Sequence, residues 1–407
     1  MNIGIVTAWY PAGAGYVSKQ YEATLAREHN VFIYARGQKA ARGDPAWERA
    51  NVTWAPRHPE SGSAMWKSHF LRWLHEKKIE TIIFNEQRYW LAVIWAKDAH
   101  VKCGAYVDYY TQDTVPFFAL YDFLVCNTKR HYSVFSWHPQ CVFVPWGVMP
   151  ESLRKPIRAS KAGPVVFIAS AGWQPKWNGD RRGTLLALKA FKDVKGDCRF
   201  RVYSQASKSE MTKEWLSAIE ADNRIELLVG TFSPFPYEEG DVYVYPSRLD
   251  GIGLTLPEAL ASGLAAIATD CAPMNEFVRQ EENGLVVPVE KYLGRQDGYY
   301  WAVSLVSQVG LTEAMQRFVD QPDFLRRMKN GAACLAEREL NWLDNSSKLS
   351  TAVSKFRMIP ADANLIRTVN NYRNSNPVTA FRHSVVQLIT WLRLWFFAEF
   401  SCIIRGS

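Results

Sequence analysis

The feature that most constrains the fold is a regular alternation of short apolar runs with segments of helical periodicity, which occurs twice along the chain. Apolar runs of about four to eight residues are typical of buried strands, and apolar residues at i, i+3, i+4 and i+7 are typical of amphipathic helices. Their alternation predicts an α/β protein with parallel sheets covered on both faces, the doubly wound class. The expected strands are 2–7, 30–35, 51–55, 81–85, 103–108, 123–127 and 141–145, followed by 165–170, 199–204, 224–229, 241–245, 265–269 and 284–288.

Two sets of strands predict two domains, which agrees with a length of 407 residues. A polar, basic stretch over 150–164 contains three prolines and no strand pattern, so the boundary is expected there. We predict a first domain over 1–155, a second over 156–356 and a C-terminal extension over 357–407. Doubly wound sheets bind ligands at the carboxyl ends of their strands, so a site is expected in the cleft between the two domains.

The loop after the strand at 241–245 carries the strongest indication of a binding site. Gly251 and Gly253 allow the backbone to turn closely, and a helix is expected to start directly after them. Free backbone N–H groups at such a turn form an anion site, so a phosphate is expected there. Asp250 and Glu258 stand eight positions apart, a spacing that can direct two carboxylates at the two ends of one ligand.

Both carboxylates also have simpler interpretations. Glu258 stands three residues after Thr255, as in a capping box, where it would accept the backbone N–H of Thr255. Asp250 precedes a glycine, as turn aspartates often do. The residue types alone leave these alternatives open.

The stretch 246–276 resembles the signature of the retaining glycosyltransferases of GT-B fold, family 4: a Pro-Ser, an acidic residue, a Gly-x-Gly and a Glu eight positions after the first acid. The resemblance extends at varying strength over 1–356. It implies two Rossmann-like domains facing across a cleft and a nucleotide-diphosphate-sugar donor. It places the donor sugar at Asp250, the nucleotide ribose at Glu258, and the donor against Gly251, Ile252, Gly253, Leu254 and Thr255. The first acidic residue is usually Glu in this family and is Asp here.

The segment 181–191 resembles the family's Lys-Gly helix start, with Arg182 in the place of the phosphate-binding lysine. A bidentate guanidinium suits a diphosphate. Lys176 is a second candidate for the same role. The alternative is that Arg181 and Arg182 form a solvated charge cluster beside Asp180.

The first domain supplies further candidates. Gly13 and Gly15 follow the first strand, where the family brings donor and acceptor together, although such a pair can also be a plain tight turn. The family often carries a histidine after a central strand of this domain; the corresponding segment 106–111 has none, and Asp108 is our substitute as a catalytic residue. Glu86 follows the strand at 81–85 and is expected to face the acceptor.

No metal or cofactor is expected. The chain has no Asp-x-Asp and no His-x-x-His, the spacings that would supply carboxylate or imidazole ligands. It also lacks a Gly-x-Ser-x-Gly elbow, a phosphate-binding P-loop and a clear Gly-x-Gly-x-x-Gly after the first strand, which removes hydrolases, NTPases and simple dehydrogenases as leading interpretations. The formal charge of +8 is spread along the chain, which suits phosphates or an acidic membrane surface and does not indicate nucleic-acid binding.

The C-terminal extension has two parts. Residues 362–377 are polar and Asn-rich, as expected of a tether. Residues 378–405 combine an apolar stripe at helical spacing with basic residues, a pattern typical of a helix on a membrane surface or of a helix packed on the body or on another subunit. No secretion signal is visible and no uncharged apolar run reaches about 20 residues, so we expect a cytoplasmic protein, peripheral at the inner face of the membrane.

These features predict an enzyme that transfers a sugar, with retention, from a nucleotide-diphosphate-sugar donor to a hydroxyl of a glycan or lipid-linked acceptor. Synthesis of a cell-envelope polysaccharide or glycolipid is the expected setting. A GT-B sugar-nucleotide epimerase or synthase, or a non-catalytic scaffold that binds nucleotide sugars or glycans, is the alternative.

Overall fold

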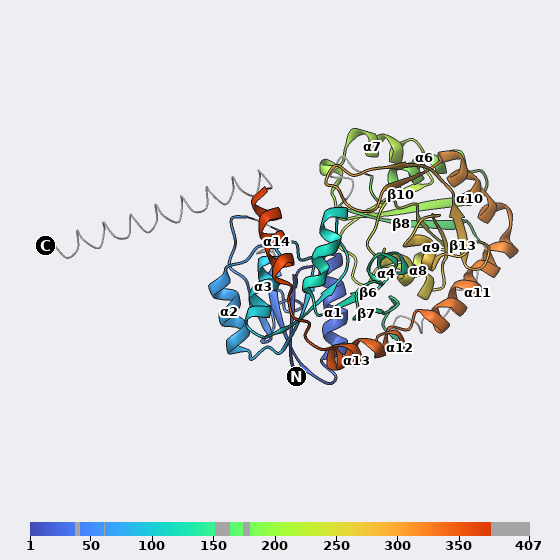
Figure 1. Cartoon of the computed structure of the whole chain (residues 1–407). Coiled ribbons are helices and arrows are strands. Elements are labelled where there is room, and N and C mark those ends of the chain that lie inside the picture. Colours follow the sequence, from blue (N-terminus) through green and yellow to red (C-terminus); the bar gives the residue numbers. More distant parts are fainter. Residues whose placement is uncertain (37–40, 61, 151–162, 174–179, 376–407) are drawn as a thin grey trace.

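The computed structural model describes residues 1–36, 41–60, 62–150, 163–173 and 180–375 (Figure 1). Each of the thirteen expected strands is present, and its ends lie within two residues of the expected ones. In the first domain the strands are β1 (Asn2–Ala8), β2 (Asn30–Arg36), β3 (Val52–Trp54), β4 (Thr81–Asn85), β5 (Lys102–Tyr106), β6 (Phe123–Cys126) and β7 (Cys141–Phe143). In the second they are β8 (Val165–Gly172), β9 (Cys198–Ser204), β10 (Ile225–Val229), β11 (Val242–Tyr245), β12 (Ala265–Thr269) and β13 (Gly284–Val287).

Both sheets are parallel and doubly wound, which confirms the predicted fold class. The first has the strand order β3-β2-β1-β4-β5-β6-β7 and the second has the order β10-β9-β8-β11-β12-β13. Strand order therefore reverses beside β1 in one sheet and beside β8 in the other. These switch points open a crevice at the carboxyl ends of the strands, where doubly wound sheets bind their ligands.

The helices lie on both faces of each sheet (Figure 1). Helices of the first domain are α1 (Gly13–Leu25), α2 (Lys67–Glu76), α3 (Leu91–Asp98), the 3₁₀ helix η2 (Gln112–Leu120) and α4 (Lys129–Phe135). The second domain carries α6 (Thr184–Phe191), η4 (Lys208–Glu210), α7 (Lys213–Glu220), η5 (Tyr237–Glu239), α8 (Thr255–Ala261), α9 (Met274–Phe277), α10 (Gln308–Asp320) and α11 (Pro322–Glu339).

The side chains on the two faces of β1 belong to two different cores. Ile3 and Ile5 of β1 belong to a core that includes α1 and continues into the second domain, whereas Val6 belongs to the core beneath α2 and α3. Across the sheet, Ile5 stands in register with Ile33 of β2 and Ile83 of β4, and all three are buried. Period-two burial of this kind fixes the register, because a slip of one residue would turn these side chains to the opposite face.

After α11 the chain returns to the first domain. Helices α12 (Trp342–Asn345) and α13 (Ser347–Lys355) lie along it, and α14 (Ala363–Ser375) packs against η2 (Figure 1). Trp342 donates its indole N–H to Thr24 over 2.8 Å and stacks on Tyr21 of α1. The second domain was expected to run to residue 356, but the residues that follow Glu339 contact the first domain. Residues 363–375 were expected to be a tether and are instead a helix. The helix is stabilised because Val369 is buried and Tyr372 packs on Phe117 of η2.

Two further strands were not expected from the sequence. Strands β14 (Val289–Leu293) and β15 (Val303–Val306) pair antiparallel, and we call residues 289–306 the arm. The arm leaves the second domain and contacts the first, where Tyr299 forms an isolated antiparallel β-bridge with Thr111. The Tyr300 N–H donates to the carbonyl of Tyr110 (2.9 Å), and the Trp301 indole N–H donates to the Tyr110 hydroxyl (2.6 Å). The arm therefore ties the two domains together.

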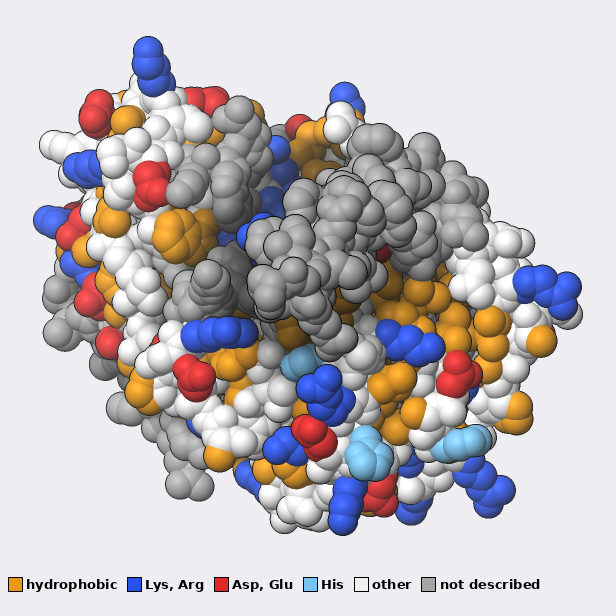
Figure 2. Space-filling model, turned by 90° about the vertical axis from the view of Figure 1, so that its left-hand side faces the viewer, with side chains coloured by type: hydrophobic (Ala, Val, Ile, Leu, Met, Phe, Trp, Pro, Cys, Tyr) orange, Lys and Arg blue, Asp and Glu red, His pale blue; other side chains and the backbone are white. Residues whose placement is uncertain are grey.

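The face of the first domain that carries α2, α3 and α14 shows Lys and Arg side chains spread among hydrophobic ones (Figure 2). Within the described residues, no helix has the length and apolar character needed to cross a bilayer. Residues 378–405, expected to form an amphipathic helix, lie outside the described residues.

Candidate active site

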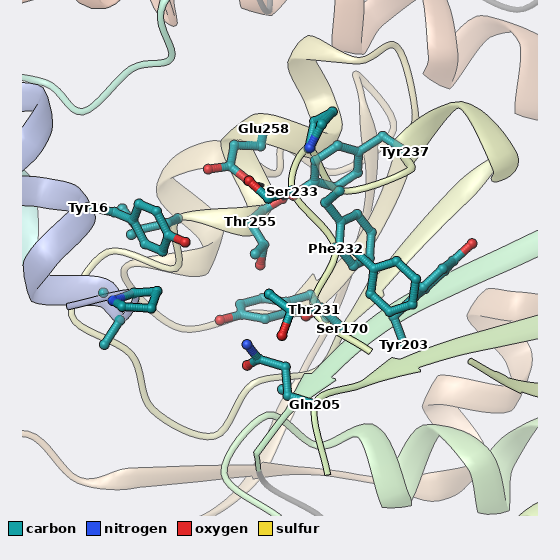
Figure 3. A pocket seen from close by; sticks show the side chains of 18 of the residues that line it. Tyr16, Ser170, Tyr203, Gln205, Thr231, Phe232, Ser233, Tyr237, Thr255 and Glu258 are labelled. Atoms are coloured by element: carbon teal, nitrogen blue, oxygen red, sulfur yellow. Dashed lines mark hydrogen bonds between the residues drawn. The ribbon is translucent and has the colours of Figure 1, made fainter. Parts of the chain in front are cut away.

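A cavity of about 520 Å³ lies between the two domains (Figure 3). The first domain lines it with the loop after β1, the start of α1 and residues 146–149. The second domain lines it with the loops that follow β8, β9, β10 and β11. Both switch points thus open into one cavity, which we call the interdomain pocket.

The glycine turn lies beside this pocket. Leu254 and Thr255 line it, whereas Ile252 is buried in the core and neither Gly251 nor Gly253 is part of the lining. Gly253 has a left-handed backbone, with φ of 81°, which explains the need for glycine there. Helix α8 begins at Thr255, so the start of this helix is the part of the predicted turn that meets the pocket.

Asp250 lines the pocket and is held by three groups. Its Oδ2 accepts the Tyr245 hydroxyl at 2.5 Å and the Arg181 Nη1 at 2.9 Å, and its Oδ1 accepts the Gly251 N–H at 3.0 Å. Burial opposes ionisation, but Arg181, the Tyr245 hydrogen bond and Arg182 outweigh it and hold the pKa of Asp250 below its ordinary value. Asp250 is therefore more than a turn aspartate: it is an anchored, ionised carboxylate at the pocket wall.

Glu258 also lines the pocket, and its partner is a tyrosine. The Tyr237 hydroxyl donates to Oε2 over 2.7 Å and also approaches the carbonyl of Thr255 (3.1 Å). Among the described residues, Glu258 accepts no hydrogen bond from the Thr255 N–H, so the capping-box interpretation is wrong. Burial raises the pKa of Glu258, while Tyr237 and Arg182 act in the opposite direction.

Arg182 brings positive charge to the same pocket. Its Nη1 donates to the carbonyl (2.8 Å) and the hydroxyl (2.9 Å) of Ser170, at the end of β8. A Cβ at Gly172 would make only an ordinary contact, 3.6 Å from the Arg182 Cζ, so glycine is favoured there by its left-handed backbone, with φ of 56°. A guanidinium has five N–H groups, and only Nη1 is used here by the described residues.

Arg181 and Arg182 are not a solvated cluster beside Asp180. Arg181 instead pairs with Asp250. Asp180 accepts the backbone N–H groups of Leu185 (3.0 Å) and Leu186 (3.1 Å) and thereby caps α6. Lys176 lies outside the described residues.

The two glycines after β1 have different surroundings. Gly13 lines the pocket, and a Cβ there would meet nothing within 4 Å. A Cβ on Gly15 would lie 2.1 Å from the carbonyl oxygen of Tyr10 and 2.9 Å from the ring of Trp47. Gly13 can therefore face a ligand, whereas Gly15 is required by packing.

Glu86 and Asp108 lie at the carboxyl ends of the neighbouring strands β4 and β5, and neither is part of the lining of the interdomain pocket. Buried Arg36 donates to the carbonyls of Asn85 and Glu86. Burial, and then the negative charge of Glu86, raise the pKa of Asp108 to about 8. The hydroxyl of Tyr299, from the arm, donates to the Asp108 carbonyl at 3.0 Å. The structure therefore brings the two first-domain carboxylates together beside a contact between the domains.

Several lining residues were not expected from the sequence. The loop 230–235 after β10 forms one wall with Tyr203 and Gln205, and Tyr16 of α1 lies on the opposite wall (Figure 3). Gln20 of the same helix also lines the pocket. The position of loop 230–235 after a buried strand could have indicated it, because that is where parallel sheets bind ligands. Nothing in the local sequence separates Tyr16 from an ordinary surface tyrosine.

Comparison with solved structures defines the class: the protein has the GT-B fold. Sucrose-phosphate synthase from Thermosynechococcus elongatus is similar over 87% of this chain and 98% of its own (TM-score 0.67, 15% identity). HepE from Anabaena, in complex with UDP and glucose, is similar over 88% and 100% (TM-score 0.69, 13% identity). The pneumococcal O-GlcNAc transferase GtfA, in complex with UDP and GlcNAc, is similar over 87% and 99% (TM-score 0.65, 13% identity).

Sequence comparison then gives the family that the second domain matches. Residues 165–294 match the family described as Glycosyl transferases group 1. The GtfA subunit of the UDP-N-acetylglucosamine–peptide N-acetylglucosaminyltransferase of Streptococcus parasanguinis is 28% identical over 158 residues, which span 37% of this chain and 29% of that protein. The lipopolysaccharide core mannosyltransferase LpsB of Rhizobium meliloti is 38% identical over 89 residues, 21% of this chain and 25% of that protein. The chain thus aligns with about a third or less of the length of these curated relatives.

Proposed function

We propose that the protein is a retaining glycosyltransferase of family 4, which moves a sugar from a nucleotide-diphosphate-sugar donor to a hydroxyl of a glycan or lipid-linked acceptor. The observation that carries the proposal is the convergence of Asp250, Glu258 and Arg182 on one interdomain pocket at the switch points of two doubly wound sheets. The family match over 165–294 and the UDP in the HepE and GtfA structures support a nucleotide-sugar donor. The synthase alternative is supported only by the likeness in fold to sucrose-phosphate synthase, and neither the epimerase nor the scaffold alternative has a counterpart among the similar proteins named above.

Each charged group has a distinct role in this proposal. Asp250 is ionised, so it accepts hydrogen bonds from the hydroxyls of the donor sugar. Glu258 binds the nucleotide ribose. The guanidinium of Arg182 meets the diphosphate, together with the backbone at Gly13 and at the start of α8.

The chemistry follows from where charge develops. When the bond between the anomeric carbon and the phosphate oxygen breaks, negative charge accumulates on the departing diphosphate. Fixed positive groups stabilise that charge more in the transition state than in the ground state, and this difference accelerates the reaction. Asp108 and Glu86 stand outside the lining of the pocket, at the carboxyl ends of β5 and β4. We assign Asp108 to the acceptor hydroxyl and Glu86 to acceptor binding. No protein nucleophile is required.

Transfer is expected to be independent of metal, because Arg182 supplies the positive charge that a divalent cation would otherwise provide. EDTA should leave the rate of transfer unchanged, whereas Arg182→Met should lower kcat by about 100-fold, in the range found when one group that stabilises a developing charge is removed. Strict dependence on added Mn²⁺ or Mg²⁺ would overturn this part of the proposal.

The proposal is tested by thermal unfolding with UDP-, GDP-, ADP- and dTDP-sugars, followed by turnover assays with candidate acceptors. A ligand that binds only the folded state at 100 times its Kd stabilises it by about 2.7 kcal/mol, so the true donor should stand out. Consumption of that donor only in the presence of an acceptor would indicate transfer. Binding without turnover would favour the scaffold, and turnover without an acceptor would favour the epimerase.

A cell-envelope setting is part of the same proposal. The net charge of +8 and the amphipathic pattern of residues 378–405 suit an anionic membrane that carries a lipid-linked acceptor. Such a protein would act at the inner face of the membrane.

A further inference from the structure

Tyr16 is an exposed tyrosine whose ring packs against a buried tryptophan. It lies on α1, one turn after the helix begins at Gly13, and is 46% exposed. Its ring meets the buried ring of Trp47 edge-on, with centroids 5.7 Å apart. Trp47 is in turn held by Trp9 at 5.2 Å and by the Lys19 ammonium at 3.6 Å. Trp47 thus fixes the orientation of the Tyr16 ring from one side and leaves the ring partly exposed.

The hydroxyl of Tyr16 points into the interdomain pocket. Tyr16 and Glu258 line that pocket from opposite domains, and the Tyr16 hydroxyl and the Glu258 carboxylate border the same open space, next to Thr255 (Figure 3). Within the described part of the chain, the Tyr16 hydroxyl has no hydrogen-bond partner. Burial, and then the charges of Glu258 and Asp44, raise the pKa of Tyr16, so the phenol remains a hydrogen-bond donor at neutral pH.

A donor and an acceptor therefore face each other across an open gap. Tyr237 occupies Oε2 of Glu258, which leaves its other carboxylate oxygen available. A sugar hydroxyl placed in the gap donates its hydrogen to a carboxylate and accepts a hydrogen bond on its oxygen. A vicinal diol such as ribose matches both walls at once, whereas a phosphate would be repelled by the carboxylate.

We propose that Tyr16 is a donor-binding residue that clamps the nucleotide ribose against Glu258 by donating a hydrogen bond to a ribose hydroxyl. The inference rests on the proposed function, because it assigns the ribose to this side of the pocket. It adds a contact from the first domain, so that one ribose joins the two domains. The expected effect is on donor affinity and KM rather than on kcat.

The test compares UDP binding by the wild type, Tyr16→Phe, Glu258→Gln and a matched control, using isothermal titration calorimetry. Tyr16→Phe keeps the ring against Trp47 and removes only the hydroxyl. The control is Tyr132→Phe, since Tyr132 is also exposed (37%) but lies on α4 and packs on Phe143, outside the pocket. Loss of a neutral hydrogen bond predicts about 3- to 10-fold weaker binding of UDP by Tyr16→Phe and no change in the control.

The same proteins are then titrated with 2′-deoxy-UDP and 3′-deoxy-UDP. With the analogue that lacks the contacted hydroxyl, wild type and Tyr16→Phe should bind equally, so the two losses are not additive. Unchanged UDP affinity in Tyr16→Phe would overturn the inference. An equal loss with UDP and with both analogues would also overturn it, because Tyr16 would then touch another part of the nucleotide.

Failure of the inference can be told from failure of the proposed function. If the wild type binds UDP and Glu258→Gln binds it more weakly while Tyr16→Phe does not, only the role of Tyr16 is lost. If the wild type binds none of UDP, ADP, GDP and dTDP, the donor pocket itself is refuted. Unchanged circular dichroism and melting temperature of Tyr16→Phe would show that the variant is folded.

Discussion

At the scale of single residues, the protein treats the two carboxylates of the pocket in opposite ways. Despite burial, Arg181 and Tyr245 hold the pKa of Asp250 below its ordinary value, whereas burial raises the pKa of Glu258. An anchored anion suits hydrogen bonds to a donor sugar. Burial of the Glu258 carboxylate costs free energy in the empty pocket. Hydrogen bonds from ribose hydroxyls would offset this cost when the donor binds.

Glu258→Gln should therefore separate binding from stability. The folded state raises the pKa of Glu258, so protonation stabilises the fold at low pH and this stabilisation is lost as pH rises through the raised pKa. Gln stays neutral, and its carbonyl can still accept from Tyr237. We expect a melting temperature at pH 8 equal to or above that of the wild type, with donor affinity about 10- to 150-fold weaker, as for a lost hydrogen bond to a charged group. A lower melting temperature with full activity would mean that Glu258 is structural.

Asp108 makes a prediction about pH. If Asp108 accepts the proton of the acceptor hydroxyl, kcat/KM should rise with pH through about 8, the pKa given by burial and Glu86. Asp108→Asn should abolish this rise. Glu86→Gln removes the negative charge that helps to raise the pKa of Asp108, so it should move the rise in kcat/KM to lower pH. A profile from pH 6 to 9.5 that is the same in all three proteins would contradict the role of Asp108.

The sequence predicted the carboxylates of the pocket but not the groups that hold them. Asp250 and Glu258 could be found because they lie only eight positions apart, on the two sides of one glycine turn. Arg181 is 69 positions from Asp250, and Tyr237 is 21 positions from Glu258. Those contacts depend on how β8, β11 and their loops align in the folded sheet, and no local spacing encodes that alignment.

At the scale of elements, strands were predictable and the arm was not. Most of the thirteen parallel strands are buried and form short apolar runs, so they were visible in the sequence, and the less buried β3, β7 and β10 still carry enough apolar residues to be found. Strand β14 has four exposed residues out of five and therefore carries no burial pattern. Helix α14 was missed for a related reason: its apolar side is narrow, and its polar remainder resembles a linker.

The arm predicts a specific loss of contact between the domains. Trp301→Phe removes the indole N–H that donates to the Tyr110 hydroxyl at 2.6 Å, and it replaces the indole that faces Arg130 at 5.2 Å by a smaller phenyl ring. We expect a loss of about 1 kcal/mol in the free energy of unfolding and faster amide exchange at 108–111, with exchange in α6 and α7 unchanged.

Tyr300→Phe is the matched control for the arm, because Tyr300 is 43% exposed and keeps its ring against Tyr110 after the hydroxyl is removed. It should leave exchange at 108–111 unchanged. If both variants exchange like the wild type, the arm does not hold the domains together.

At the scale of the whole molecule, the chain crosses between its domains more than once. It enters the second domain after residue 150, returns through Trp342 to the first, and ends its described part at α14, packed on η2. The site thus lies between two bodies joined by the interdomain crossings, the arm and a shared core. The sequence predicted two domains and a cleft, but it placed the boundary by order along the chain and could not show that residues 342–375 return to the first domain.

The last prediction concerns the residues that follow α14. The sequence of 378–405 predicts an apolar stripe that inserts at the headgroup level of a membrane and basic residues that meet anionic lipid, each worth about 1 kcal/mol near the surface. The full chain should therefore float with anionic vesicles, and it should be released by salt. Truncation after Ser375 should abolish flotation and preserve turnover of a water-soluble acceptor analogue. Truncation after Asp362 should also lower the melting temperature, because it removes Val369, which is 2% exposed, from the surface of η2. If the full chain does not float with vesicles, or if truncation after Ser375 changes the oligomer size in light scattering, residues 378–405 are an assembly or packing element. The proposal of a lipid-linked acceptor would then lose its main support.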